Sequence, residues 1–383
     1  MDFSILKTTI RFPPAIGGAE LYIENIADRL CNKNYKIKII TTNLRQHINN
    51  LKFKKDELQN YKKNYQIIRS KTIHIPHSTY HISFDMLFYL LKSNYDIFHT
   101  YCIHYFPAFA TKFISLLKNK PFFCTPIFDI NNAKNNKLYF SIICKFISIA
   151  NGIIFISEYE KNSFLKFFPA IKKFIIIPPS LDDDFTRINM NEVNINKFNI
   201  LNKYKFKILF AGRLCYGKGI DILLNAINLL KEKINDYVVI LAGEDFGFEY
   251  EIKKIINQFN LKNIVIYKDI IYSELKYLYS ISDLLVLPSR YEAFGIVIIE
   301  AMAFKLPVIA MNNSAIPYLI ENNKTGLLFE NENYKELAEK IFLLLNTKNL
   351  KEEIINYSYD FVKANFNWNN TINNLISFYK ANI

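Results

Sequence analysis

The 383-residue sequence predicts an α/β protein with two domains, each built on a parallel sheet. Half of its residues are hydrophobic, which is enough for two well-packed cores in a chain of this length. Short apolar segments with strand character alternate with longer segments of helical periodicity. A polar, Asn-rich stretch near the middle separates two such series, so we expect one domain on each side of it.

The first series defines an N-terminal domain, which we place at residues 1–181. A helix is expected at residues 21–30. The expected strands are residues 3–8, 36–41, 97–100 and 153–156. Residues 43–71 are polar, lysine-rich and without clear periodicity, which predicts a long mobile loop or a poorly ordered helix.

The second series follows a linker at residues 182–202 and defines a domain at residues 203–365. Its expected strands are residues 205–211, 238–242, 264–267, 284–287 and 308–310. Apolar residues recur with helical spacing in residues 366–383, so the chain is expected to end in an amphipathic helix.

The positive charge is concentrated in the first half of the sequence. Residues 1–180 carry 25 Lys and Arg against 11 Asp and Glu, a net charge of +14, whereas residues 181–383 carry 23 against 24, a net charge of −1. A coding bias towards lysine would spread the charge evenly, so the asymmetry favours an acidic partner for the first half: an anionic membrane surface, a lipid-linked diphosphate acceptor or an acidic glycan. Nucleic acid is not expected, because no recognisable nucleic-acid-binding motif accompanies the charge.

The cysteines and the apolar segments favour a cytoplasmic protein. The five cysteines form no Cys-x2-Cys pair, which is typical of reduced thiols rather than of a disulfide framework or a zinc site. The start of the chain has no basic region followed by an apolar run, so no signal peptide is expected. The most apolar window, residues 138–156, is interrupted by Lys145 and Asn151 and is interpreted as a buried helix followed by a strand.

Residues 289–303 are the most informative segment. A helix that starts near Gly295 leaves Glu292 in the preceding loop and Glu300 more than one turn inside. At a rise of ~1.5 Å per residue the two carboxylates are then about 10 Å apart, roughly the span from a ribose across a diphosphate to a sugar. The amides of the helix start lie between them, at the positive end of the helix dipole, where phosphate binds. Alternatively, this is a buried helix with solvated glutamates at its ends, and a buried Glu300 then needs a polar partner.

This segment resembles the Glu-x7-Glu signature of retaining glycosyltransferases of family 4 (glycosyl transferases group 1), which have the GT-B architecture. Similarities run from about Pro13 to Trp368. The resemblance implies two Rossmann-like domains that face a cleft, with the acceptor held by the first domain and a nucleotide-sugar donor by the second, and a C-terminal helix that crosses back to the first. It also implies that Glu292 contacts the sugar and that Glu300 accepts hydrogen bonds from the ribose. The implied donor-binding residues in this segment are Glu292, Ala293, Phe294, Gly295, Ile296 and Glu300.

A second set of candidates follows the first expected strand of the second domain. Gly212 and Arg213 come directly after the strand, and Lys218 follows in the same loop, ahead of an apolar helix. An arginine fork and a lysine charge held by a glycine-rich turn can neutralise a departing diphosphate. The pair is similar to the phosphate-binding Arg and Lys of the family, and the alternative is two solvated loop cations.

The first domain offers candidates at two turns. Gly17 and Gly18 follow the first strand, and such a turn lets backbone amides approach a ligand, which the resemblance implies is the donor. His99 stands at the first position of the family's His-x-His motif, and Tyr101 replaces the second histidine, which in the family faces the transferred sugar. Two interpretations of His99 remain open, an active-site residue or a buried, hydrogen-bonded core histidine. Tyr101 can hydrogen-bond a sugar hydroxyl, and His104 lies on the next turn.

Other positions also depart from the family's pattern. Lys305 stands where the family usually has glycine, and residues 314–318, Ser-Ala-Ile-Pro-Tyr, replace a Gly-Gly-x-Pro-Glu pattern, so that Tyr318 takes the place of a glutamate. These substitutions concern sugar recognition.

No metal site is expected. Residues 182–184 are three aspartates and formally contain the Asp-x-Asp of metal-dependent transferases, but their place after Ile-Pro-Pro-Ser matches the family's interdomain connection. His74, His77 and His81 have helical spacing, but Pro76 between them disfavours a continuous helix.

The leading hypothesis is therefore a retaining, metal-independent hexosyltransferase. It moves a hexose from a nucleoside-diphosphate sugar to an envelope glycan, a lipid-linked oligosaccharide or a glycoprotein glycan, and it works in the cytoplasm with peripheral association of its basic half with the inner face of the membrane. The expected catalytic residues are Arg213, Lys218, Glu292, His99 and Tyr101. The alternatives are a catalytically weakened nucleotide-sugar-binding subunit that partners an active transferase, and a GT-B phosphorylase or epimerase.

Overall fold

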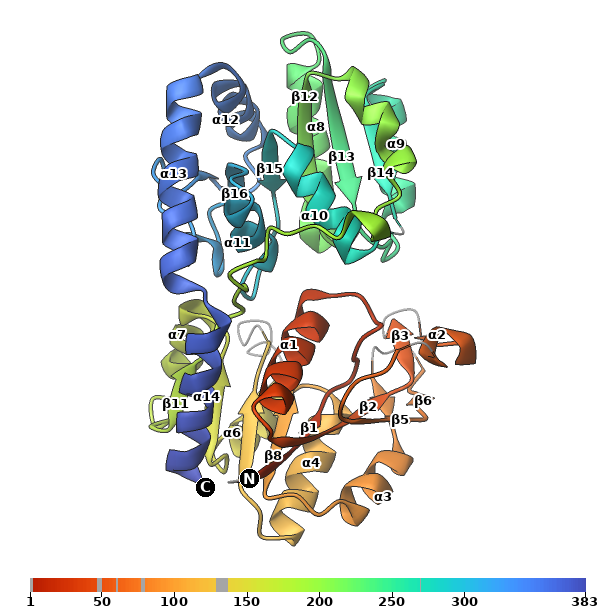
Figure 1. The fold of residues 1–383 in the computed structure, drawn as a ribbon, viewed down its shortest axis with the longest axis vertical. Helices are drawn as coiled ribbons and strands as arrows, with labels where there is room; N and C mark the ends of the chain where they lie inside the picture. The colour runs from red at the N-terminus through yellow and green to blue at the C-terminus, as the bar shows by residue number, and fades with distance from the viewer. Residues whose placement is uncertain (1–2, 47–49, 60, 77–79, 129–136, 269) are drawn as a thin grey trace. The chain divides into compact units, whose positions relative to one another are not determined.

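The computed structural model describes residues 3–46, 50–59, 61–76, 80–128, 137–268 and 270–383. The chain forms two compact units, Met1–Pro179 together with Trp368–Ile383, and Ser180–Asn367 (Figure 1). The expected linker, residues 182–202, lies within the second unit, where Met190–Glu192 and Ile195–Lys203 form 3-10 helices. The predicted architecture of two Rossmann-like domains is confirmed.

The first unit is built on a seven-stranded parallel sheet with strand order β11-β10-β9-β8-β1-β2-β5. The strands are β1 (Ser4–Thr8), β2 (Lys36–Thr42), β5 (Gln66–Ser70), β8 (Ile97–Tyr101), β9 (Phe122–Thr125), β10 (Gly152–Phe155) and β11 (Phe174–Ile176). The helices are α1 (Gly18–Asn32), α2 (Lys55–Gln59), α3 (Phe84–Lys92), α4 (Phe106–Leu117), α6 (Lys137–Ile147) and α7 (Glu158–Phe167). Four short strands form two separate hairpins: β3 (Leu44–Gln46) with β4 (Leu51–Lys52), and β6 (Ile73–His74) with β7 (His81–Ile82).

The described part of residues 43–71 contains regular structure that the sequence did not suggest. The expectation of a mobile loop or a poorly ordered helix was wrong for Gln66–Ser70, which forms the edge strand β5. Ile67 and Ile68 pair in parallel register with Ile39 and Ile40 of β2. Backbone pairing with β2 therefore orders Gln66–Ser70, although this segment has only a short apolar run of its own.

The C-terminal helix α14 (Trp368–Asn382) belongs to the first unit, which confirms the predicted return of the chain. Tyr379 packs edge-on against Phe123 of β9 with the ring centroids 5.0 Å apart. Phe378 lies over Gly152, where a Cβ atom would be 2.6 Å from the ring, so only glycine fits at the start of β10. Trp368 stacks on Tyr22 of α1 with the ring centroids 6.3 Å apart.

The second unit is built on a six-stranded parallel sheet with strand order β14-β13-β12-β15-β16-β17. The strands are β12 (Phe206–Ala211), β13 (Tyr237–Ala242), β14 (Ile264–Tyr267), β15 (Leu284–Leu287), β16 (Val308–Met311) and β17 (Leu327–Phe329). The helices are α8 (Ile220–Leu230), α9 (Glu249–Gln258), α10 (Tyr272–Ile281), α11 (Ile296–Ala303), α12 (Tyr334–Asn346) and α13 (Lys348–Asn365). The direction of the strand order reverses between β12 and β15, and the crevice at the carboxyl ends of such a strand pair is the usual ligand site of this type of sheet.

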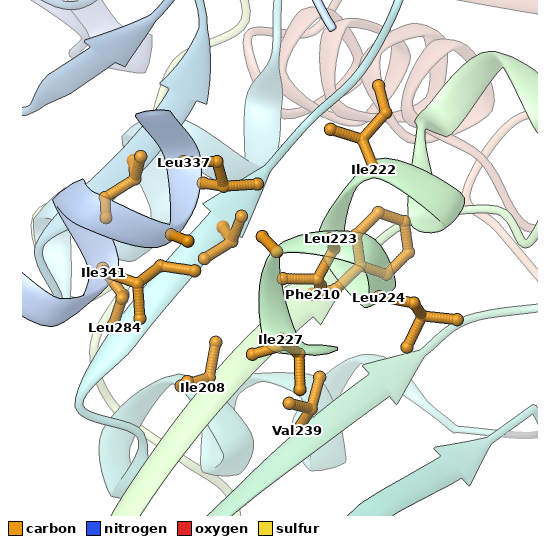
Figure 2. Packing of buried hydrophobic residues seen from close by; sticks show 14 of the residues in the cluster. Ile208, Phe210, Ile222, Leu223, Leu224, Ile227, Val239, Leu284, Leu337 and Ile341 are labelled. Carbon is orange, nitrogen blue, oxygen red and sulfur yellow. The ribbon is translucent and has the colours of Figure 1, made fainter. Parts of the chain in front are cut away.

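One face of this second sheet packs on α8 and α12 through aliphatic side chains. Figure 2 shows Ile208 and Val239 of the sheet facing Leu223 and Ile227 of α8, with Ile341 of α12 nearby. All five are fully buried. This packing fixes the strand ends and hence the loops that follow them.

All five cysteines are free thiols. Across the part of the chain that the structure describes, no helix combines the length and the apolar character that crossing a membrane requires.

Candidate functional site

The loops after β12 and β13 lie in direct contact in the second unit. The amide of Gly212 donates to the carbonyl of Ala242 over 2.9 Å. Gly243 has φ +152°, and a Cβ atom there would be 2.0 Å from the carbonyl oxygen of Gly212. A side chain at position 243 would therefore separate the two loops, and glycine keeps the backbone at the sheet edge open to a ligand.

The loop after β12 also meets the loop after β15. Gly219, at the start of α8, has φ +65°, and a Cβ atom there would be 1.9 Å from the carbonyl oxygen of Pro288. The Lys218 Nζ forms an ion pair with the Glu292 carboxylate, and both side chains are largely buried. The Ser289 hydroxyl donates to the same carboxylate over 2.9 Å. The structure thus brings together Lys218 and Glu292, two residues that the sequence identified separately.

Arg290 holds these two loops to each other, and the sequence did not single it out. Its guanidinium donates two hydrogen bonds to the Asp221 carboxylate, over 2.9 and 2.8 Å, and one to the Tyr216 carbonyl over 2.7 Å. Its Nε donates to Glu332 over 2.7 Å, and its backbone amide donates to the Gly217 carbonyl over 2.9 Å. Hydrogen bonding to Asp221 raises the pKa of Arg290. The one signal in the sequence was the position of Arg290 between Ser289 and Glu292.

Arg213 contributes a cation to the same edge of the sheet. Its guanidinium lies over the ring of Phe246 at 5.2 Å, and the side chain is partly buried. Within the described ranges it forms no ion pair or side-chain hydrogen bond. The loop that carries it is fixed, because Leu214 donates to the Glu244 carbonyl over 2.8 Å and Phe246 donates to the Leu214 carbonyl over 2.9 Å. A planar cation on a fixed loop is suited to binding an anionic group.

The helix α11 begins at Ile296, next to the start that the sequence predicted. Gly295 precedes it in the left-handed conformation, with φ +96°. Phe294 is buried and packs edge-on against Phe366, with the ring centroids 5.7 Å apart. The first amides of a helix have no intrahelical acceptor, so the start of α11 presents donors close to Glu292.

Glu300 is buried and has two partners. The hydroxyl of Tyr272 donates to one oxygen of its carboxylate, and the hydroxyl of Tyr279 donates to the other over 2.8 Å. Burial raises the pKa of Glu300, and these two hydrogen bonds oppose the rise. The sequence predicted that a buried Glu300 needs a polar partner, and the structure supplies two from α10.

His99 and Tyr101 lie in the interior of the first unit. Nδ1 of His99 is 2.6 Å from the Tyr379 hydroxyl of α14, and Nε2 is 2.8 Å from the Thr125 hydroxyl. Tyr101 accepts a 2.6 Å hydrogen bond from the fully buried Nζ of Lys7. Burial lowers the pKa of His99 and of Lys7 and raises that of Tyr101. In this arrangement, neither His99 nor Tyr101 has exposed surface for a sugar.

His104, on the turn after β8, is the other histidine of this region. Its ring contacts the rings of Tyr105 and Phe128, with centroid distances of 4.0 and 4.7 Å. Burial lowers the pKa of His104 to about 3, so the ring is neutral at pH 7. Among the residues that the structure describes, Nδ1 of His104 has no hydrogen-bond partner.

The Gly17-Gly18 turn makes room for a buried ion pair. A Cβ atom at Gly17 would be 2.1 Å from a carboxylate oxygen of Glu20. Glu20 pairs with Arg11, and both side chains are buried. Arg11 also donates to the Arg45 carbonyl over 3.0 Å. The sequence did not predict this use of the turn, because Arg11 precedes the motif.

In the described ranges, no group of three His, Cys, Asp or Glu side chains is arranged to hold a metal ion. Asp183 accepts a 2.9 Å hydrogen bond from Asn367. The rings of His74 and His81 are 4.9 Å apart on the β6-β7 hairpin, and His77 lies outside the described residues.

Comparison with known proteins agrees with the observed fold. Residues 192–361 match the family model described as Glycosyl transferases group 1, and residues 16–185 match the model described as Glycosyltransferase Family 4. An uncharacterised glycosyltransferase of Methanocaldococcus jannaschii is 24% identical, over 98% of this chain and 97% of the relative.

Solved structures of GT-B proteins share the fold over nearly the whole chain. Sucrose-phosphate synthase from Thermosynechococcus elongatus superposes with a TM-score of 0.78 at 19% identity, covering 99% of this chain and 98% of that one. Anabaena HepE in complex with UDP-glucose superposes with a TM-score of 0.79 at 16% identity, covering 99% and 100%.

Proposed function

This chain belongs to the GT-B glycosyltransferases of the group 1 and family 4 type, and we propose that it transfers a hexose from a nucleoside-diphosphate sugar with retention of configuration. One observation carries the proposal: the loop with Arg213 and Lys218 meets the loop with Glu292 at the start of α11. Opposite charges and helix amides converge there on the carboxyl edge of a parallel sheet, where nucleotides bind in such folds.

The leaving group determines the roles that we assign to the two cations. As the bond to the sugar breaks, negative charge develops on the nucleoside diphosphate. Arg213 can bind this charge with two parallel hydrogen bonds, and Lys218 adds a point charge. The carboxylate of Glu292 orients Lys218 and contacts the transferred sugar. Because protein cations and the amides of α11 supply the neutralisation, we propose that no metal ion is required.

Glu300 is assigned to the ribose. Each oxygen of its carboxylate accepts one phenol hydrogen bond and retains capacity for a second. Tyr272 is partly exposed, whereas Tyr279 is buried. We therefore propose that the ribose hydroxyls approach Glu300 from the side of Tyr272.

In the first unit, the burial of His99 and Tyr101 favours positioning roles over contact with the sugar. His104 is the candidate for such contact, because its ring nitrogen lacks a partner among the described residues. Gly17 and Gly18 are proposed to bring the backbone of their turn to the donor.

The acceptor is proposed from the charge of the first half of the chain. An envelope glycan, a lipid-linked oligosaccharide or a glycoprotein glycan each fits a basic surface when it carries acidic groups or a diphosphate. Five free thiols are compatible with the proposed cytoplasmic location.

Nucleotide binding tests the proposal. A thermal-shift panel of UDP-, GDP- and ADP-sugars identifies the base, and titration calorimetry then compares Arg213→Ala and Lys218→Ala with the wild type. Each substitution should weaken binding by about 1–3 kcal/mol, because each removes a hydrogen bond to a charged group. The matched control is Lys348→Ala, a lysine on α13 that is almost fully exposed.

Unchanged affinity in both variants would remove the diphosphate assignment. Transfer that stops when a chelator is added would contradict metal independence. Donor binding without transfer to any acceptor would favour the alternative of a weakened binding subunit.

A further inference from the structure

The outward faces of α3 and α4 carry large apolar side chains that are each at least half exposed. These residues, which we call the α3-α4 face, are Phe84, Phe88 and Leu91 on α3 and Phe113, Leu116 and Leu117 on α4. Phe88 and Leu91 follow at spacings of four and three residues on α3, and Leu116 and Leu117 lie three and four residues after Phe113 on α4, which places each set on one side of its helix. The two helices pack against each other, as Figure 1 shows, so the two sets lie on neighbouring elements of the first unit.

The opposite sides of these helices are already used for folding. Met86 and Leu90 of α3 and Ile114 of α4 are buried in the core of the first unit. The exposed apolar residues are therefore additional to those that the fold requires. Apolar patches of this kind mark surfaces for partners or membranes.

Lysines lie on and beside the two helices of the α3-α4 face, and Asp85 of α3 is the one exposed carboxylate on these helices. Lys92 lies over the ring of Phe88 at 4.1 Å, and Lys118 ends α4. Lys112 reaches the Lys145 carbonyl of α6 over 3.3 Å. In the described part of the chain, none of these four lysines forms an ion pair. Apolar side chains with such lysines beside them are complementary to a surface that is apolar inside and anionic at its rim.

The lysine-rich residues 43–71 fit this role less well, because among their described residues only Leu51 is a large exposed apolar side chain. Lys63 pairs with Glu24 and Asp28, and Arg45 pairs with Glu57. These pairs neutralise charge within the unit.

We propose that the α3-α4 face docks on an anionic lipid bilayer, with its apolar side chains among the acyl chains and its lysines at the headgroups. Charge decides between this occupant and a second copy of the chain, because two copies meeting here would bring like-charged lysines together. Docking on the bilayer would bring the enzyme to a lipid-linked acceptor. Only this choice of acceptor rests on the proposed function.

Co-sedimentation with vesicles tests this docking. The full chain should sediment with vesicles of phosphatidylcholine and phosphatidylglycerol but not with phosphatidylcholine alone, and 0.5 M salt should weaken the binding. The variant Phe113→Ser with Leu117→Ser should bind at least tenfold more weakly. Leu343→Ser, an exposed apolar residue of α12, is the matched control. Lys92→Glu should also weaken binding, whereas Lys348→Glu, on the exposed surface of α13, should not.

Three results would overturn the proposal. These are no binding of the wild type to anionic vesicles, equal binding by the double variant, and a concentration-dependent dimer that the double variant abolishes. The last result would assign the face to a second copy. Arg213→Ala should bind vesicles normally and the double variant should bind nucleotide normally, so failure of the docking and failure of the donor site are distinguishable.

Discussion

Replacing Gly219 by alanine tests whether contact between the loops after β12 and β15 builds the proposed donor site. Gly219 has φ +65° and ψ +28°, and a Cβ atom would lie 1.9 Å from the Pro288 carbonyl oxygen. Contacts shorter than 3.0 Å are essentially never seen for a real Cβ atom. Both the Cβ position and the Pro288 carbonyl are fixed by backbone, so the two loops must move apart by at least 1.1 Å, the difference between 3.0 and 1.9 Å.

The expected effect has two parts. The left-handed conformation costs an alanine roughly 1–2 kcal/mol of stability, and the displacement adds strain. The same displacement separates Lys218 from Glu292 and shifts both relative to the start of α11. A misplacement of about 1 Å at a reacting centre can reduce the rate about 100-fold, and we expect a loss of this order in the initial rate of transfer.

Two other glycines of the same unit serve as controls. Gly247 has φ +91° and Gly217 has no φ in the left-handed range, and an added Cβ atom would meet nothing within 4 Å at either position. Gly247→Ala should therefore show only the conformational cost, and Gly217→Ala should show neither cost. Urea unfolding measures stability, and initial rates measure transfer. A Gly219→Ala enzyme as stable as Gly217→Ala, or as active as Gly247→Ala, would refute the loop-contact argument.

Two further predictions concern Arg290 and Glu160. Arg290→Lys should weaken nucleotide binding roughly tenfold in titration calorimetry, because a lysine cannot reproduce the guanidinium hydrogen bonds to Asp221, Glu332 and the Tyr216 carbonyl. If Arg290 and Asp221 act as one unit, Asp221→Asn should cause an equal loss of affinity. The double variant should then bind no more weakly than either single variant. Glu160 is buried and accepts hydrogen bonds from the amides of Ile156 and Phe128, and burial raises its pKa from 4.5 to about 7. The folded state therefore holds this proton more tightly than the unfolded state, and the associated stability, about 3 kcal/mol, is present below pH 4.5 and is lost as the pH rises through 7. Urea unfolding should show the advantage of the wild type over Glu160→Gln shrinking between pH 4.5 and pH 8, and a constant difference would contradict the assignment.

Local signals in the sequence were sufficient for the scaffold and for part of the site. The alternation of strands and helices predicted the two parallel sheets, because a strand that is buried in a parallel sheet can be recognised from its own continuous apolar run. Gly295 and the apolar residues after it marked the start of α11 to within a residue or two. Parallel strand order then placed Gly212, Arg213 and Glu292 at the same edge of a sheet.

The partners of the site residues could not be predicted, because they depend on tertiary contacts. Lys218 and Glu292 are 74 residues apart, and Arg290 and Asp221 are 69 apart. The environment of His99 depends on Tyr379, 280 residues later, so no local pattern distinguishes a buried histidine from an exposed one at this position. The edge strand β5 was missed because its apolar core is only Ile67 and Ile68, and its order comes from β2.

Lys305 and Ser314 depart from the family's pattern, and their backbone conformation bears on the choice between an active transferase and a weakened binding subunit. Lys305 has φ +56° and Ser314 has φ +51°, so both keep the left-handed conformation that favours the glycine usual in similar sequences. At Lys305 this closes α11 normally: its amide donates to the Met302 carbonyl over 3.0 Å, and the next amide donates to Ala301 over 2.9 Å. Both substituted positions therefore adopt a backbone conformation that glycine also adopts, and the turn after α11 is closed by backbone hydrogen bonds. This supports our proposal of a working transferase, with altered sugar recognition at the half-exposed Tyr318, over the alternative of a subunit that has lost its site.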